Sequence, residues 1–363
     1  MNHRPTAICF SLALAALLIA VVLVPDREIS YTERRRLEQF PAVSVSGVLS
    51  GEWTPAFERW LLDQFPGREA FRSLALGFRT RVLLQGDYNG VYVVNGKAAS
   101  IEYPLNEASV TALAEKINAL CDEHFPYSRA YCALIPDKGY YLSGERGRLA
   151  LDFERMEALL ADGLEGVSYL SVKGLLNADC YYDTDIHWRQ ERILPVVQRL
   201  LRAMDAGGPP PEYEPRSYAP FYGSYYSQAV GVEADELVYL SSPDIARARV
   251  ENLQKPEFGG VYDEAALGGM DSYDVFFSGA TPFIRVLNTA PAPAAKGRTL
   301  VLVRDSFGSS LAPLLLHAYE TIVLLDLRYM SSSILSEYLQ TGAHTDVLFL
   351  YGAQLANNSG LLR

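Results

Sequence analysis

The sequence predicts an α/β protein built around a parallel sheet. Near the C-terminus, three apolar runs typical of buried strands alternate with two helical stretches, at 300–303, 307–318, 322–325, 331–340 and 347–350. This order requires crossover connections, which are right-handed and place the strands in parallel. Two more strand patterns, 131–135 and 167–170, lie among amphipathic helical stretches upstream. Chemistry in such sheets is expected where the carboxyl ends of the strands meet.

Composition excludes several classes of function. Apolar residues make up 49% and charged residues 21% of the 363 residues, which is ordinary for a globular chain. The net charge of −11 argues against nucleic acid as a partner, because phosphate recognition needs concentrated positive charge. The four cysteines form no CxxC pair and the five histidines have no ligand spacing, so we expect no metal and no cofactor. Cys121 and Cys132 are the candidate disulfide pair.

An apolar N-terminal segment sets the expected compartment. Residues 7–24 are eighteen residues without a charge, long enough to span a bilayer with slight thinning. No small-residue cleavage site follows, which favours an uncleaved signal anchor over a cleaved secretory signal. Arg34–Arg36 after the segment would favour the opposite orientation, but a short tail before an apolar run is typical of export. We therefore expect a single-pass protein of the cell membrane with its C-terminal domain extracytoplasmic.

The predicted organisation follows from these segments. Residues 1–25 form the cytoplasmic tail and anchor, 26–50 a polar, irregular stalk, and 51–363 the folded domain. Within that domain, 51–100 is predicted to hold two helices, broken at Pro66-Gly67 and beginning at Thr54 as N-cap, and a hairpin turning at Asn95-Gly96. Residues 207–298 are rich in aromatics and loops and are predicted to be an insertion with short strands.

Ser306 is the candidate nucleophile. It follows the 300–303 strand directly and precedes a helix, so it lies at a strand carboxyl end and a helix N-terminus. A hydroxyl there gains from the helix dipole, and the backbone N–H groups of Phe307 and Gly308 are candidate oxyanion donors. The alternative is that Ser306 merely caps the helix.

The short turn Asp185-Ile186-His187-Trp188 supplies a candidate base. A catalytic serine needs a base, and that base needs a carboxylate on its other nitrogen to fix its tautomer. Asp185 and His187, separated by one residue, can provide such a pair. The alternative is that Asp185 caps a helix beginning near His187, with Trp188 anchoring the turn in the core.

Three sequence stretches together resemble the DHHW family, which is related to extracytoplasmic alginate O-acetyltransferases. They are the Asp185-x-His187-Trp188 turn, the stretch from Phe57 to Arg68 and the stretch from Asp305 to Tyr329 with its Asp326-Leu327-Arg328-Tyr329 motif. The resemblance implies a three-layer α/β/α, SGNH-hydrolase-like (flavodoxin-like) sheet with catalytic motifs in permuted order. It also implies Ser306 as nucleophile, His187 as base and Asp185 as acid. The sequence departs from the family in having Ile186 at the second motif position and Arg304 before Asp305.

The expected activity is acyl transfer to a cell-surface or exported polysaccharide, with the acetyl group delivered by a multipass membrane-bound O-acyltransferase, as the resemblance implies. A carbohydrate esterase with the same triad, or a catalytically silent polysaccharide-binding or assembly subunit, are the alternatives. Further residues are predicted to bind substrate or the oxyanion: Tyr182, Trp188, Lys138, Arg328 and Tyr329 for substrate, and Asn357 and Asn358 besides Phe307 and Gly308 for the oxyanion.

Overall fold

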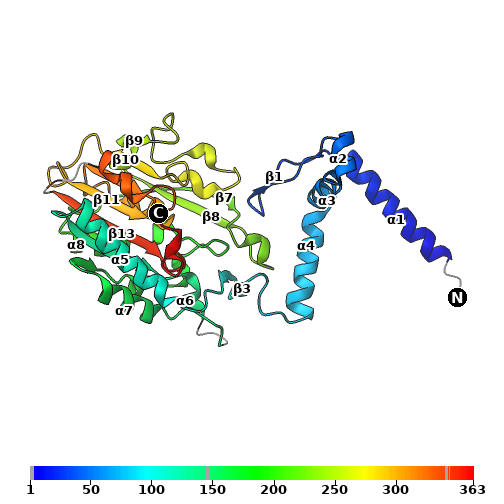
Figure 1. The fold of residues 1–363 in the computed structure, drawn as a ribbon, viewed down its shortest axis with the longest axis horizontal. Coiled ribbons are helices and arrows are strands. Elements are labelled where there is room, and N and C mark those ends of the chain that lie inside the picture. Colours follow the sequence, from blue (N-terminus) through cyan, green and yellow to red (C-terminus); the bar gives the residue numbers. More distant parts are fainter. Residues whose placement is uncertain (1–3, 144–146, 340–341, 343) are drawn as a thin grey trace. The chain divides into compact units, whose positions relative to one another are not determined.

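The computed structural model describes residues 4–143, 147–339, 342 and 344–363. The chain divides into two compact units, Met1–Asn89 and Gly90–Arg363, which we call unit 1 and unit 2. Figure 1 shows the helices of unit 1 in blue and cyan, and the sheet with its covering helices in unit 2.

Unit 1 begins with the apolar helix α1, Arg4–Leu23, which is long and apolar enough to span a membrane. Short elements follow: β1 (Ile29–Ser30), β2 (Arg35–Arg36), α2 (Val45–Ser50), α3 (Trp53–Gln64), α4 (Arg68–Gly77) and the π-helical turn η1 (Phe78–Val82). The break between α3 and α4 falls at Pro66-Gly67 as predicted, and Gly67 has a positive φ of 75° that suits glycine. Helix α3 begins one residue before Thr54, so Thr54 is not its N-cap.

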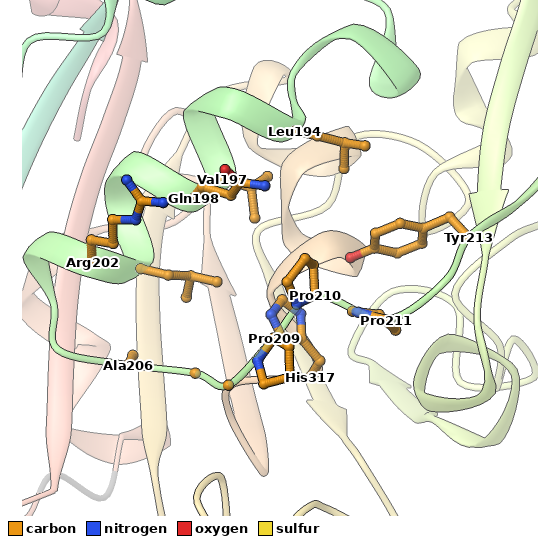
Figure 2. A pocket seen from close by; sticks show the side chains of 13 residues that line it. Leu194, Val197, Gln198, Arg202, Ala206, Pro209, Pro210, Pro211, Tyr213 and His317 are labelled. Atoms are coloured by element: carbon orange, nitrogen blue, oxygen red, sulfur yellow. The ribbon is translucent and has the colours of Figure 1, made fainter.

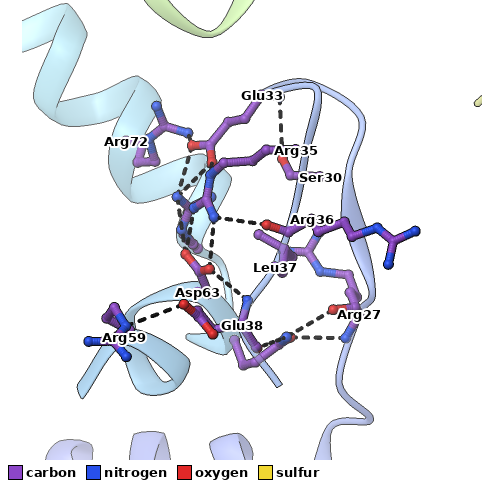
Figure 3. A network of polar contacts seen from close by, with 12 residues as sticks. Arg27, Ser30, Glu33, Arg35, Arg36, Leu37, Glu38, Arg59, Asp63 and Arg72 are labelled. Atoms are coloured by element: carbon purple, nitrogen blue, oxygen red, sulfur yellow. Dashed lines mark hydrogen bonds and ion pairs between the residues drawn. The ribbon is translucent and has the colours of Figure 1, made fainter. Parts of the chain in front are cut away.

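The segment predicted as an irregular stalk carries the antiparallel β1–β2 pair and packs on α3 and α4 through ion pairs (Figure 3). Glu33 accepts a hydrogen bond from Arg35 Nε at 2.7 Å and from Arg68 Nη2 at 2.8 Å, and it also pairs with Arg72. Arg35 bonds both carboxylate oxygens of Asp63 on α3, and this hydrogen bonding lowers the pKa of Asp63. The network joins the turn between β1 and β2 to both helices.

Unit 2 is built on a seven-stranded sheet of the predicted class. The strand order is β6-β5-β13-β11-β12-β10-β9. Neighbouring strands from β6 to β12 pair in parallel, whereas β10 pairs antiparallel with both β12 and β9. Their bounds are β6 Val167–Tyr169, β5 Arg129–Ile135, β13 Thr345–Gly352, β11 Thr299–Arg304, β12 Thr321–Leu325, β10 Phe283–Leu287 and β9 Arg249–Asn252.

Helices cover both faces of this sheet, which makes three layers. Successive side chains of a strand point to opposite faces, and β11 illustrates this: Leu300 and Leu302 join one core cluster, Val301 and Val303 the other. The first cluster includes α8 (Leu194–Ala203) and α10 (Phe307–Leu315), and the second includes α5 (Glu107–His124) and α7 (Phe153–Gly163). Because both faces of strands such as β11 are buried, nearly all of their residues are apolar, and the sequence alone therefore indicates them as strands.

The structure changes three sequence expectations. Residues 207–298, predicted as an insertion, supply β9 and β10 to the central sheet and form the hairpin of β7 (Glu214–Phe221) and β8 (Asp235–Ser241). The helix predicted at 331–340 is reduced to the single turns η8 (Ser332–Ile334) and α11 (Leu335–Tyr338). Cys121 and Cys132 are free thiols, so the candidate disulfide is absent.

The hairpin predicted in the first hundred residues is confirmed. Strands β3 (Val91–Val94) and β4 (Lys97–Ser100) pair antiparallel, and Asn95 and Gly96 between them have φ values of 50° and 78°. Positive φ at both central residues is the requirement of a type I′ turn. The backbone N–H of Ala98 donates to the carbonyl of Asp183, which joins this hairpin to the turn that carries Asp185 and His187.

Candidate active site

Ser306 lies between β11 and α10, at the carboxyl end of the parallel strands. It occupies the N-cap position of α10, yet its side chain makes no capping hydrogen bond. Its hydroxyl instead lies 2.8 Å from Nε2 of His187. Ser306 is half-buried, whereas its neighbours Asp305 and Phe307 are buried. The structure therefore excludes the interpretation of Ser306 as a simple helix cap.

Asp185 and His187 complete a continuous hydrogen-bonded chain with Ser306. Nδ1 of His187 lies 2.5 Å from Oδ1 of Asp185, and the backbone N–H of His187 donates to the same oxygen at 3.0 Å. The second oxygen, Oδ2, accepts a bond from the backbone N–H of Ser224 at 2.7 Å. A proton on Nδ1 that faces the carboxylate leaves Nε2 free to accept from the serine hydroxyl. No helix begins at His187, so Asp185 is not a helix cap.

A buried lysine holds the backbone of this turn. Nζ of Lys138 donates to the carbonyls of Tyr182 at 2.6 Å, Asp183 at 3.1 Å and Asp185 at 3.1 Å. Lys138 is only 3% exposed, and burial lowers its pKa to about 8. It was predicted to bind an anionic substrate group. The structure corrects this, because all three of its N–H donors face carbonyls of the turn.

Asp235, at the start of β8, holds the N–H groups of the same turn. Its carboxylate accepts bonds from the backbone N–H of Asp183 at 2.7 Å and of Thr184 at 2.8 Å, and from the Thr184 hydroxyl at 2.6 Å. The chain at Gly223 passes so close that a Cβ atom there would lie 2.3 Å from the Thr184 carbonyl oxygen. Only glycine fits at position 223.

Aromatic rings fix the plane of the imidazole. The ring of Tyr273 stacks on His187 with a centroid distance of 3.8 Å and an interplanar angle of 8°. Its hydroxyl donates to Ser310 Oγ on α10, which also accepts the indole N–H of Trp188 at 2.7 Å. Trp188 was predicted to bind substrate, but it is fully buried. Its role is to attach the turn to helix α10, which carries the nucleophile at its start.

The predicted oxyanion donors are engaged elsewhere. The N–H of Phe307 donates to Oδ1 of Asp305, and that of Gly308 to the Asp305 carbonyl. Oδ2 of Asp305 accepts the N–H of Gly352, which ties the serine turn to the end of β13. Gly308 serves packing, since a Cβ atom there would lie 2.6 Å from Cβ of Arg304.

Asn357 and Asn358 also fail as oxyanion donors. Asn357 accepts the backbone N–H of Asn106 at 2.7 Å and donates to the carbonyl of Pro104, so it holds the segment that leads into α5. The amide of Asn358 donates to the carbonyl of Gln354 in its own turn. Both follow β13, the strand next to β11, but their amides bond to local backbone.

The remaining predicted substrate ligands divide into a buried and an accessible group. Tyr182 is fully buried, with its ring edge-on to Phe221, so it does not line a surface that substrate reaches. Arg328 lies at the carboxyl end of β12 and makes two bonds to Asp326, at 2.9 and 2.6 Å. Tyr329 beside it is 50% exposed. Of the predicted substrate ligands, only Arg328 and Tyr329 are accessible to solvent at the carboxyl edge of the sheet.

Sequence reasoning missed four residues that build the site: Ser224, Asp235, Tyr273 and Ser310. Each reaches the turn from a distant part of the chain and carries no motif. A local sequence pattern cannot indicate such contacts.

A cavity of about 410 Å³ lies on another part of unit 2 and contains none of the triad (Figure 2). Leu194 and Val197 of α8, the Pro209–Pro211 loop and His317 line it. His317 follows the C-terminal end of α10, which is the end opposite to Ser306. Burial lowers the pKa of His317, which favours the neutral imidazole. This cavity is separate from the candidate active site.

The three-layer sheet with Ser306, His187 and Asp185 at its carboxyl edge defines an SGNH-like α/β protein. A DHHW family protein from Eubacterium siraeum has a similar structure, with a TM-score of 0.61 and 18% identity over 76% of this chain and 95% of that chain. PatB1 of Bacillus cereus, in a structure with a sulfonyl adduct, gives a TM-score of 0.55 and 16% identity over 73% of this chain and 95% of that chain. No family model and no curated protein matches the sequence. The predicted relation to the DHHW family is confirmed at the level of fold.

Proposed function

We propose that this protein is a membrane-anchored, extracytoplasmic O-acyltransferase that acetylates a polysaccharide through an acyl-enzyme on Ser306. The observation that carries the proposal is the unbroken chain from Asp185 through His187 to the Ser306 hydroxyl, with separations of 2.5 and 2.8 Å. Nucleophile, base and orienting carboxylate within hydrogen-bond reach are the signature of an activated serine.

Each residue of the chain has a defined role in the proposed reaction. Ser306 Oγ attacks the acyl carbonyl while His187 Nε2 takes its proton, and the donor's leaving group receives that proton as the acyl-enzyme forms. A sugar hydroxyl then attacks the acyl-enzyme, gives its proton to Nε2, and Ser306 leaves with that proton. Asp185 stabilises the imidazolium in both steps. Ser306 is the N-cap residue of α10, so negative charge on the attacked oxygen develops beside the positive end of this helix, while the N–H groups of Phe307 and Gly308 remain bonded to Asp305.

Nucleophile variants test the chemistry. Ser306→Ala and His187→Ala should each reduce acetyl release from an activated ester by at least about 10³-fold, because a triad acts as a unit. Sulfonyl fluorides leave sulfonyl groups on activated nucleophiles, and the PatB1 structure carries a sulfonyl adduct. Mass spectrometry should locate such an adduct on Ser306 in the wild type and find none in the His187→Ala variant. Modification at full rate without His187 would contradict the assignment.

The acceptor is tested by competition between sugar and water. Water is present at about 55 M, so a transferase must orient its sugar hydroxyl, and effective molarities of 10⁵ M or more are attainable by orientation. With an acetyl donor and oligosaccharides, acetylated sugar should exceed free acetate. Acetate in excess with every oligosaccharide would make the protein an esterase. No acyl chemistry at all would favour a polysaccharide-binding or assembly subunit.

The donor route and the membrane topology have their own test. By the family resemblance, a multipass membrane-bound O-acyltransferase would deliver the acetyl group to the outer face. Helix α1 supports an anchor. The full chain should remain with membranes after alkaline carbonate washing, and protease added to intact cells should degrade unit 2. Protection of unit 2 would mean that Arg34–Arg36 sets the opposite orientation.

A further inference from the structure

Helix α4 and the turn η1 that continues it expose a stripe of apolar side chains. Phe71, Leu74, Phe78 and Val82 are spaced i, i+3, i+7 and i+11 and are 55%, 70%, 52% and 61% exposed. We call these four residues the α4 stripe. Residues with this spacing share one helix face, while Leu76 of the same helix is buried against the unit. Contiguous exposed apolar surface of this kind marks an interaction site.

The charges beside the stripe are positive. Residues 68–82 contain four arginines and one acidic residue, Glu69. Arg79 follows Phe78 directly and Arg81 precedes Val82, so one arginine lies on each side of the stripe near its C-terminal end. Arg72, which follows Phe71, is paired with Glu33. Unit 1 as a whole has ten basic and nine acidic side chains, so all of the chain's net negative charge resides in unit 2. Unit 1 is therefore the part of the chain suited to a negatively charged surface.

We propose that the α4 stripe lies in the headgroup region of an anionic membrane. The proposal rests on anchoring by α1, which belongs to the same compact unit. An apolar face flanked by arginines is the pattern of an interfacial helix, whose apolar side chains enter the acyl boundary while the cations meet lipid phosphates. A second copy of the chain fits the stripe less well, because pairing two stripes would bring the arginines of both copies together.

Spin labels on the full chain test the proposal. Leu74→Cys places a nitroxide on the stripe, and Ser73→Cys places one on the neighbouring exposed position away from it. Both carry Cys9→Ala, and the Cys9→Ala parent measures background labelling of the native thiols. The proteins are reconstituted in phosphatidylcholine vesicles with and without phosphatidylglycerol. Flotation with the vesicles first checks that α1 anchors the chain.

The label at position 74 should collide with oxygen several-fold more than with a water-soluble nickel chelate, and the label at 73 should show the reverse. Arg79→Gln with Arg81→Gln should reduce the difference in vesicles that contain phosphatidylglycerol. Equal access of nickel to both positions would overturn the proposal and leave the helix in water. Shielding of position 74 from both reagents would overturn it in favour of a protein surface. Failure to float would contradict the anchor instead.

Discussion

Two turns in this chain are held by charged side chains, but in opposite ways. In unit 1, the carboxylate of Glu33 is surrounded by the guanidinium groups of Arg35, Arg68 and Arg72 (Figure 3). In unit 2, the turn of Asp185 and His187 is held by Lys138 and Asp235, and both make their direct hydrogen bonds to groups of the turn other than the Asp185 carboxylate. One turn is fixed by pairing charge with charge, the other mainly by bonding charge to backbone.

The difference explains what each turn is able to do. A carboxylate saturated by three arginines has no bonding capacity left, so the unit 1 turn serves attachment. In unit 2, backbone carbonyls and N–H groups meet the ions, and the carboxylate of Asp185 stays available to His187. A buried charged side chain that bonds to backbone carbonyl or N–H groups fixes the turn without pairing directly with the Asp185 carboxylate. Variants of the charged residues in the two turns distinguish these two modes.

Among the residues that hold the two turns, the largest expected effect comes from Lys138→Met, which keeps the length of the side chain and removes its three donors. Misplacing a catalytic group by about 1 Å costs about 10² in rate, so kcat should fall by about 100-fold with little change in KM. The matched control is Lys97→Met. Lys97 touches the same turn through the carboxylate of Asp183 at 2.5 Å, and its loss should change kcat far less. An equal decrease of kcat in the two variants would contradict the claim that bonding to the backbone matters more than pairing with the Asp183 carboxylate.

The pH dependence of activity sharpens the same point. Burial lowers the pKa of Lys138 from its ordinary 10.5 to about 8, against the opposing effect of Asp185, Asp235 and Asp183, while Lys97 adds to the lowering. Above pH 8 the neutral amine has two donors for three carbonyls, so kcat should decline, and this decline should vanish in Lys138→Met. The free energy of unfolding should change in the opposite direction. Between pH 8 and 10.5 Lys138 is protonated in the unfolded chain and neutral in the folded chain, so its contribution to the free energy of unfolding increases as the pH rises. A kcat profile identical in both proteins would contradict the assignment.

The sequence predicted the parts of the site that are local. The strand before Ser306 is buried on both faces and reads as a continuous apolar run, and Asp185 and His187 lie two residues apart. What holds them is long-range: Asp235 lies about fifty residues from the turn it binds, and Tyr273 stacks on His187 from further still. Strand β9, with only Arg249–Asn252, is too short for a periodic pattern. The oxyanion prediction failed because Asp305 occupies the N–H groups that a helix N-terminus normally leaves free.

A smaller effect is expected from Asp235→Asn. The carboxylate of Asp235 accepts three bonds, and an amide would turn an N–H group toward at least one of those donors. Leaving a buried donor unpaired costs about 1–3 kcal/mol, which should appear as a lower midpoint of denaturation. We expect kcat to fall by about tenfold, less than for Lys138→Met, because Lys138 still holds the carbonyls. A variant that loses stability but keeps full kcat would show that Asp235 supports the fold alone.

The smallest catalytic effect is expected in unit 1. Glu33→Gln removes the negative charge from the three arginines and should leave kcat within about twofold of wild type, because the arginines that Glu33 pairs with all belong to unit 1 and none is part of the triad. Local stability should fall instead: partly buried ion pairs are strong only while both charges are present, so backbone amides of 29–37 should exchange hydrogen about tenfold faster, which corresponds to about 1.4 kcal/mol.

Glu38→Gln is the matched control, because Glu38 pairs with Arg59 at 3.3 Å and both side chains are more than half exposed. Exposed pairs contribute about 0–1 kcal/mol, so exchange in the same segment should change little. Exchange equally fast in both variants would mean that the three arginines do not hold the turn. A large loss of kcat in Glu33→Gln would mean that unit 1 takes part in the reaction, and the contrast between an attachment turn and a catalytic turn would no longer stand.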